Sequence, residues 1–296
     1  MERKSPVAGV FLSILPMLVA FGCQLVASLF ATIGFTVYKT FQYAAQGIVP
    51  DAFGLLQEVT GDPGFTALNM VTAELVMIVC GALWYYLAYR KQENGFKTLK
   101  PVYLLFAVFA GIAIQALCSI FLTIAFNLLP EAFTESYEEL TDMLFDTSSV
   151  WYAICVVVLA PIAEEHFFRG ITLKLLKNHN VNIVAAVIIQ GFWFGFLHWL
   201  GGLFSLGTLI QAVYAFAMGV VFGFVAAKLN SVWPTVILHM AVNGSGELLS
   251  VLSGKLEKPE ILKFGMIPVG ILCLAISILL YLKVKPMEEP YGQNLI

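Results

Sequence analysis

Residues 149–177 read SVWYAICVVVLAPIAEEHFFRGITLKLLK, an apolar run with two glutamates, a histidine and an arginine near its middle. About 20 consecutive apolar residues are enough to cross a bilayer as a helix. An ionisable side chain inside such a helix costs roughly 2.5 kcal/mol or more, so its presence needs a reason. The run therefore predicts a membrane helix and, within it, a polar site.

The composition of the whole chain agrees with a membrane location. Of the 296 residues, 59% are hydrophobic, and the 16 basic and 19 acidic residues make only 12% charged, with a mean hydropathy of +0.86. Soluble domains carry about 25% charged residues. We therefore predict an all-α polytopic protein that has membrane lipid as its surroundings. The net charge of −3 provides no basic field, so nucleic acid is excluded as a partner.

Seven further apolar runs are long enough to be membrane helices, so eight are expected in all. The first run follows Arg3 and Lys4 as a signal peptide would, but it is far longer than a roughly 7 to 15 residue signal core, and we expect it to be retained. The seven runs are Val7–Tyr38, Phe65–Tyr89, Val102–Leu129, Asn182–Leu200, Leu203–Leu229, Val232–Ser250 and Phe264–Leu282.

The basic residues between the runs predict the orientation. If the N-terminus is cytoplasmic, eleven cations lie inside: Arg3, Lys4, Arg90, Lys91, Lys97, Lys100, Lys174, Lys177, Lys228, Lys283 and Lys285. Only four lie outside: Lys39, Lys255, Lys258 and Lys263. Because cytoplasmic loops of membrane proteins carry the excess of Lys and Arg, we expect both termini to be cytoplasmic.

Three parts of the chain can be distinguished. Residues 1–148 are expected to form three membrane helices and an outer acidic helix that contains Glu131, Glu135, Glu138, Glu139, Asp142 and Asp146. Residues 149–250 carry four helices and most of the polar groups, and residues 251–296 form the last helix and a cytoplasmic tail. The five cysteines all lie in apolar runs, and we expect them to pack without disulfide, redox or metal roles: Cys23, Cys80, Cys118, Cys155 and Cys273.

The pair Glu164–Glu165 is the most informative polar feature. Glu165 and Arg169 are four residues apart, so on a helix they can form an ion pair, while Glu164 points about 100° away. Pro161 removes a backbone hydrogen bond and is expected to kink the helix beside the pair and to open space for water. A carboxylate without a fixed cation can act as a general base. The alternative is a packing salt bridge beside a spectator acid.

Two later runs contribute polar groups at similar depth. His198 follows the aromatic sequence FWFGF at 192–196, and His239 and Asn243 share one helix face. At about 1.5 Å per residue, Glu164, His198, His239 and Asn243 lie roughly 14 to 27 Å from the cytoplasmic edge. We therefore expect one buried site on three helices. Taken singly, the histidines and the asparagine could equally be satisfied or interhelical polar groups.

These motifs together resemble a known family. Glu164-Glu165-xxx-Arg169, Phe194-xxx-His198 and His239-xxx-Asn243, in this order on separate helices, are similar to those of the CAAX protease and bacteriocin-processing family (CPBP or Abi) of intramembrane endopeptidases. Type II CAAX prenyl endopeptidases are among its members. The resemblance covers roughly residues 149–250 and implies an intramembrane active-site cavity in an integral protein of a bacterial cell membrane.

The resemblance also implies a role for each matching residue. Glu164 would be the general base, His198 would help to bind and polarise the attacking water, and His239 and Asn243 would stabilise the oxyanion. Glu165, Arg169 and Phe194 would support the site. The implied substrates are lipidated CAAX-type proteins or bacteriocin and signal peptides, and the motifs choose neither among them nor an oligomeric state.

A metal is a separate question. Glu164, His198 and His239 could supply three zinc ligands, but the sequence has no HExxH motif. The resemblance to glutamate-dependent members favours water activation with no metal and no cofactor.

Other mechanisms and functions fit less well. Ser245 is the only tempting serine nucleophile, and it lies in a small-residue packing segment. All four aspartates lie in expected outer loops: Asp51, Asp62, Asp142 and Asp146. A proton-coupled transporter would use similar buried groups, but the chain shows no inverted repeat. A scaffold or immunity protein without catalysis remains an alternative.

Two membrane glutamates stand outside the motifs. Glu74 lies in the second helix, and Glu247 continues the face of His239 and Asn243 by one turn. We expect both near the outer boundary with partial solvation, and a supporting role at the cavity mouth is the alternative.

Overall fold

The structure, a computed structural model, describes residues 5–92, 100–144, 150–253 and 260–283, and in these ranges it consists of helices without a strand. The elements are α1 (Pro6–Leu12), α2 (Ile14–Ala45), α3 (Ala52–Thr60), α4 (Pro63–Tyr89), α5 (Pro101–Leu128), α6 (Glu131–Leu144), α7 (Val150–Ile154), η1 (Cys155–Leu159), α8 (Ala160–Glu165), η2 (His166–Thr172), α9 (Leu173–Asn178), α10 (Ile183–Gly201), α11 (Leu206–Leu229), α12 (Trp233–Ser253) and α13 (Glu260–Lys283).

Eight spans within the described ranges are long and apolar enough to cross a membrane, which confirms the predicted number. Large apolar side chains point outward from them, including Phe11, Phe30 and Leu279. Such a surface is stable only when lipid replaces water around it. The chain is an integral membrane protein of all-α architecture. Its spans are Pro6–Ala45, Pro63–Tyr89, Pro101–Leu128, Val150–Asn178, Ile183–Gly201, Leu206–Leu229, Trp233–Ser253 and Gly265–Lys283.

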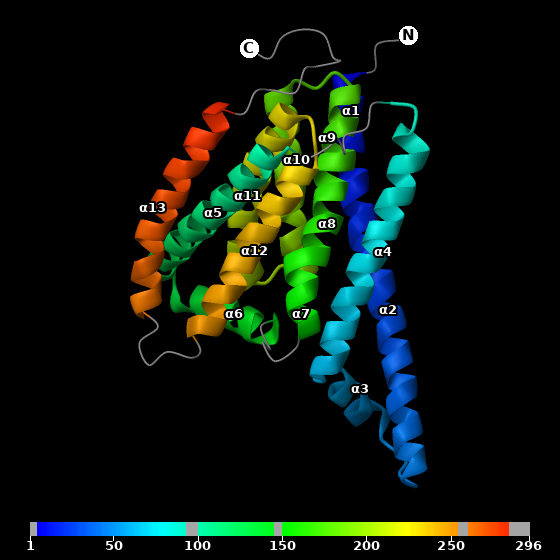
Figure 1. The fold of residues 1–296 in the computed structure, drawn as a ribbon. Helices are drawn as coiled ribbons and strands as arrows, with labels where there is room; N and C mark the ends of the chain where they lie inside the picture. Colours follow the sequence, from blue (N-terminus) through cyan, green and yellow to red (C-terminus); the bar gives the residue numbers. More distant parts are fainter. Residues whose placement is uncertain (1–4, 93–99, 145–149, 254–259, 284–296) are drawn as a thin grey trace.

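Two helices between the spans, α3 and α6, lie at the same end of the bundle (Figure 1). The start of α1 and the end of α13 lie at one end, and α3 and α6 lie at the other (Figure 1). The acidic segment forms the predicted helix, α6, and it packs against the start of α11, where the backbone N–H of Gly207 donates to Ser136 Oγ at 3.0 Å. The last acid of that segment, Asp146, lies outside the described residues.

The long run at 149–177 is helical throughout, but its hydrogen bonding changes twice. The N–H of Ala160 bonds the carbonyl of Cys155, and the N–H of Leu173 bonds that of Phe168. Both bonds span five residues, so η1 and η2 are π-helical, and α8 is a short α-helical piece between them. π-Helical turns are rare and often occur at functional sites. The kink expected beside Pro161, which follows η1 closely, stays a prediction.

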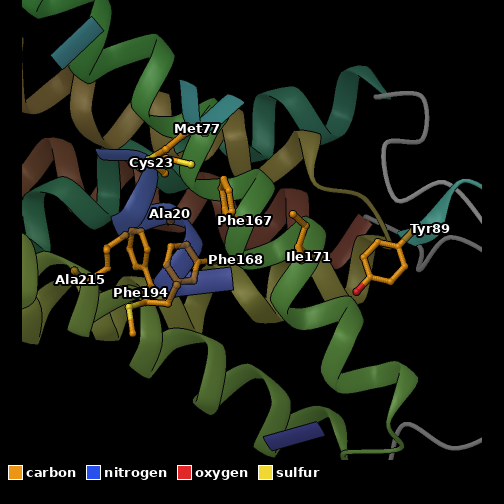
Figure 2. Close-up of a cluster of buried hydrophobic side chains, with 12 residues drawn as sticks. Ala20, Cys23, Met77, Tyr89, Phe167, Phe168, Ile171, Phe194 and Ala215 are labelled. Atoms are coloured by element: carbon orange, nitrogen blue, oxygen red, sulfur yellow. The ribbon is translucent and has the colours of Figure 1, made fainter. Parts of the chain in front are cut away.

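One apolar cluster surrounds the second π-helical segment. Phe167, Phe168 and Ile171 of η2 are completely buried, and they pack with Met17 and Ala20 of α2, Met77 of α4 and Phe194 of α10 (Figure 2). The rings of Phe168 and Phe194 meet edge to face, with their centroids 5.1 Å apart. Because η2 follows α8 directly, this packing also fixes the position of the two glutamates.

Helices α10 and α11 approach each other closely through glycines. A Cβ added at Gly195 would lie 2.6 Å from the carbonyl oxygen of Ala212 and 2.9 Å from the Cβ of Phe216. Gly191 of α10 and Gly219 of α11 make a second close contact of this kind. Small residues at such contacts allow membrane helices to pack backbone against backbone. This contact sets the position of Phe194 and His198, which lie on α10.

Substitution of Gly195 by valine is expected to destabilise the fold. The added side chain would force α10 away from the α11 backbone, and overpacking of this kind costs about 1–3 kcal/mol. The control is Gly34→Val on α2, where the added Cβ has no neighbour within 4 Å. Thermal unfolding in detergent should give a lower Tm for G195V than for G34V. Equal values for the two variants would contradict the close contact.

Candidate active site

Glu165 and Arg169 form the predicted ion pair. Arg169 Nη1 lies 2.8 Å from Glu165 Oε1, and both side chains are fully buried. The pair joins the last residue of α8 to the middle of η2, so the four-residue spacing holds although the second residue is in a π-helical segment. The two charges neutralise each other in a place that neither could occupy alone.

Aromatic rings and a backbone carbonyl hold the guanidinium. Its Cζ lies 4.6 Å from the ring centre of Phe194 and 5.2 Å from that of Phe222. Arg169 Nη2 donates to the carbonyl of Gly219 at 3.2 Å, and Gln190 Nε2 donates to the same oxygen at 2.7 Å. A desolvated cation–π contact contributes about 2 kcal/mol. Helices α10 and α11 are thereby tied to η2.

The sequence reasoning included Phe194 among the supporting residues but missed Phe222 and Gln190. Gln190 could have been suspected, because it is a polar residue in the middle of an apolar run. Phe222 carries no such signal, because one phenylalanine among the 24 of the chain looks like any other.

His239 of α12 lies between the two glutamates. Its Nδ1 is 3.1 Å from Glu165 Oε1, and its Nε2 is 3.8 Å from Glu164 Oε2. Because the Glu165 carboxylate already binds Arg169 and can only accept, Nδ1 is the donor. Nε2 then faces Glu164, as an acceptor in the neutral ring and as a donor in the imidazolium. The Glu164 side chain is 12% exposed, whereas that of Glu165 is completely buried.

Asn243, one turn further along α12, reaches the first π-helical segment. Its Nδ2 donates to the carbonyl of Val156 at 2.9 Å. The amide group has a second N–H, so this bond orients the side chain without using up its donors. Asn243 and His239 thus lie on the face of α12 that packs against η1 and α8.

His198 of α10 contacts Phe194, which also contacts His239. Its Nδ1 bonds the carbonyl of Phe194 at 2.9 Å, and its ring lies 4.8 Å from the Phe194 ring. The same phenylalanine ring lies 5.9 Å from that of His239. Within the described ranges, His198 has no hydrogen bond or ion pair with Glu164, His239 or Asn243. The Phe194 ring therefore contacts both imidazole rings.

The expectation for Glu74 was wrong. This residue is 8% exposed, so it is not partly solvated. The count along the helix placed it in the span but gave no information on the neighbouring helices. Glu247 is intermediate in exposure, although its Oε2 is buried without a hydrogen-bond partner.

The donor set does not fit a zinc ion. In the part of the chain that the structure describes, no three His, Cys, Asp or Glu side chains converge as metal ligands. Glu164 and His239 are neighbours, whereas His198 Nδ1 bonds the carbonyl of Phe194, and zinc needs its ligand atoms at about 2 Å. The cavity expected around these residues stays a prediction.

Comparison with known proteins gives one match. Residues 146–245 match the family model of Rce1-like type II CAAX prenyl endopeptidases. This Rce1-like segment confirms the family resemblance. It contains Glu164, Glu165, Arg169, Phe194, His198, His239 and Asn243. The family is one of CAAX-type intramembrane proteases. No curated protein and no solved structure matches the chain.

The buried ion pair is expected to behave as a unit in the Rce1-like segment. Arg169→Met leaves Glu165 charged and buried, and loss of one partner costs about 3–5 kcal/mol. Glu165→Gln combined with Arg169→Met should cost less than the sum of the two single changes. Unfolding of the four species in detergent measures this coupling.

The control is Arg90→Met, because Arg90 is exposed and lies over the ring of Tyr86. Exposed charges change stability by about 1 kcal/mol or less. Additive effects at Glu165 and Arg169 would contradict the assignment of a coupled buried pair.

Proposed function

We propose that the chain is an intramembrane endopeptidase in which Glu164 activates a water molecule for attack on a peptide bond. The observation that carries this proposal is the difference between the two adjacent glutamates. Glu165 is fully buried and bound by Arg169, while Glu164 keeps some exposure and faces an imidazole at 3.8 Å. One carboxylate is neutralised, and the other is available as a base.

The chemistry follows from the positions of the donors. Glu164 takes a proton from water as the water oxygen attacks the carbonyl carbon. Nε2 of the His239 imidazolium and Nδ2 of Asn243, one helical turn apart, then donate to the oxyanion of the tetrahedral intermediate. When the C–N bond breaks, Glu164 returns its proton to the leaving amine. His198 helps to bind and polarise the water from the neighbouring helix.

Glu165 gives His239 its orientation. A carboxylate that accepts from Nδ1 holds the imidazole in one tautomer and stabilises the imidazolium, which is the arrangement by which a third group supports a catalytic histidine. Because the same oxygen, Oε1, also binds Arg169, the position of His239 depends on the buried ion pair. Arg169 and Phe194 therefore support the site without contacting the substrate.

The proposed substrates are peptides at the membrane. The match of residues 146–245 to type II CAAX prenyl endopeptidases supports a lipidated CAAX-type protein, and bacteriocin or signal peptides are the alternative class. We propose that the enzyme acts in a cell membrane with both termini on the cytoplasmic side. The cation distribution supports this orientation.

Glu164→Gln is expected to abolish proteolysis without loss of the fold. Loss of a general base lowers the rate by roughly 10²- to 10⁴-fold. Membrane peptides from cells without the protein and from cells with the wild-type or variant protein would be compared by mass spectrometry. An uncleaved precursor should accumulate with E164Q and without the protein.

The matched control is Glu131→Gln, because Glu131 is an exposed residue of α6. It should process the precursor as the wild type does. Normal processing by E164Q at normal expression would refute the proposed function.

We propose that this hydrolysis needs no metal. The purified protein should hold zinc well below one ion per chain, as measured by elemental mass spectrometry, and a chelator should leave cleavage unchanged. The physical reason is that His198, Glu164 and His239 do not converge as metal ligands in the described part of the chain. Stoichiometric zinc that follows activity and disappears in His198→Ala would overturn this expectation.

A further inference from the structure

Gln190 of α10 is a buried polar residue to which the proposed chemistry gives no part. It lies in the middle of an apolar span and is completely buried. A polar side chain in such a place needs partners, because unpaired polar groups are costly away from water. Its Nε2 donates to the carbonyl of Val187, one turn back on α10, at 2.9 Å, and to the carbonyl of Gly219 on α11 at 2.7 Å.

Stability alone does not explain a glutamine at this position. Its acceptor atom, Oε1, is buried without a hydrogen-bond partner within the described chain. A buried acceptor in this state lowers stability, whereas leucine fills a similar volume with no polar atom. Hydrogen bonds between membrane helices stabilise only modestly on average. The informative feature of Gln190 is therefore what its amide holds in place.

Two glycines of α11 let the amide lie against the backbone of that helix. A Cβ added at Gly223 would lie 2.4 Å from Gln190 Nε2, and one added at Gly219 would lie 2.8 Å from Gly191 Cα. Gly219 and Gly223 are four residues apart, so they lie on one face of α11 and form a small-residue contact. The amide occupies this face, and a side chain at position 223 would displace it.

The Gly219 carbonyl is shared with the guanidinium of Arg169. Arg169 Nη2 lies 3.2 Å from this oxygen and Gln190 Nε2 lies 2.7 Å from it, so the two donors meet at one acceptor. Gln190 thus fixes the α11 backbone at the point where this backbone holds the arginine. A shift of the carbonyl would weaken one of the hydrogen bonds that orient the guanidinium.

A continuous series of contacts leads from the guanidinium to the proposed base. Arg169 Nη1 binds Glu165 Oε1 at 2.8 Å, and the same oxygen accepts from His239 Nδ1 at 3.1 Å. His239 Nε2 in turn faces Glu164 Oε2 at 3.8 Å. The position of the imidazole therefore depends on how firmly the guanidinium is held.

We propose that Gln190 is a positioning residue for the hydrolysis. By holding the Gly219 carbonyl beside Arg169, it fixes Glu165 and thereby the His239 ring that faces Glu164. This inference rests on the proposed function, because it gives Gln190 a part in that chemistry. Loss of the amide should lower kcat and leave KM unchanged, since His239 acts on the transition state and Gln190 does not contact the substrate.

Gln190→Leu is the first test. The amide is lost but the volume is kept, so the variant should unfold in detergent at a Tm close to that of the wild type. Misplacement of a reacting group by about 1 Å can cost roughly 10²-fold, and we expect kcat for cleavage of a prenylated CAAX-type peptide to fall by about 10- to 100-fold. An unchanged kcat, or a rise in KM alone, would overturn the proposal.

Gly223→Ala is an independent second variant. It keeps Gln190 but places a Cβ where the amide nitrogen lies, so the end of the glutamine side chain has to move away. It should reproduce the fall in kcat with KM unchanged, and it decides the question if Q190L does not fold. A wild-type kcat in G223A would contradict the proposal.

The matched controls change the same residue types elsewhere in the spans. Gln115→Leu removes a glutamine of α5 that lies against Gly246 of α12, and Gly34→Ala adds a Cβ on α2 that has no neighbour within 4 Å. Both variants should cleave the peptide as the wild type does. A fall in kcat as large in Q115L as in Q190L would show a general effect of losing a span glutamine and would overturn the assignment.

Histidine ¹⁵N NMR tests the positioning without any substrate. His239 Nδ1 donates to Glu165 and should give the signal of a single, hydrogen-bonded Nδ1–H in the wild type. In Q190L and G223A this signal should shift or split. The signal of His179, whose Nδ1 bonds the Leu175 carbonyl at the end of α9, should stay in place. An unmoved His239 signal in these variants would overturn the proposal.

The two failures remain distinguishable. A wild-type protein without Glu164-dependent cleavage would refute the proposed function, whereas the NMR result would still support or overturn the dependence of His239 on Gln190.

Discussion

The buried pair of Glu165 and Arg169 is the interaction on which the rest of the site depends. A single charge cannot remain in the middle of a membrane helix bundle, and even a pair repays its desolvation only if further polar partners are close. These partners come from other helices: the Gly219 carbonyl and the Phe222 ring from α11, the Phe194 ring from α10 and the His239 imidazole from α12. The pair, which spans α8 and η2, thus requires α10, α11 and α12 to converge on it.

Because of this convergence, the ion pair also fixes the orientation of the reacting groups. Glu165 Oε1 holds the His239 ring, and the ring directs its other nitrogen at Glu164. The first π-helical segment does the same for Asn243, because it presents the Val156 carbonyl to the amide at 2.9 Å. A π-helical turn shifts the carbonyls relative to an α-helix, so such a turn beside the glutamates provides an acceptor for the neighbouring span.

The sequence predicted the features that depend on one helix at a time. The eight spans follow from apolar length, and the Glu165–Arg169 pair follows from the four-residue spacing. It did not predict features that depend on neighbouring helices. Depth counting placed His198 at the level of the site but could not show that the Phe194 ring contacts both His198 and His239, and it could not show that α4 packs against α8. Lateral position depends on packing, which residue spacing does not encode.

The adjacent glutamates show how one short helix can serve both structure and chemistry. Successive residues of a helix point about 100° apart, so Glu164 and Glu165 face different neighbours although their backbones adjoin. Glu165 faces the arginine, and its charge takes part in the ion pair that holds the helices together. Glu164 faces His239, with no arginine or lysine paired to it in the described structure. Because η2 immediately follows Glu165, the cation and the base are fixed by the same rigid segment, and neither can move without the other.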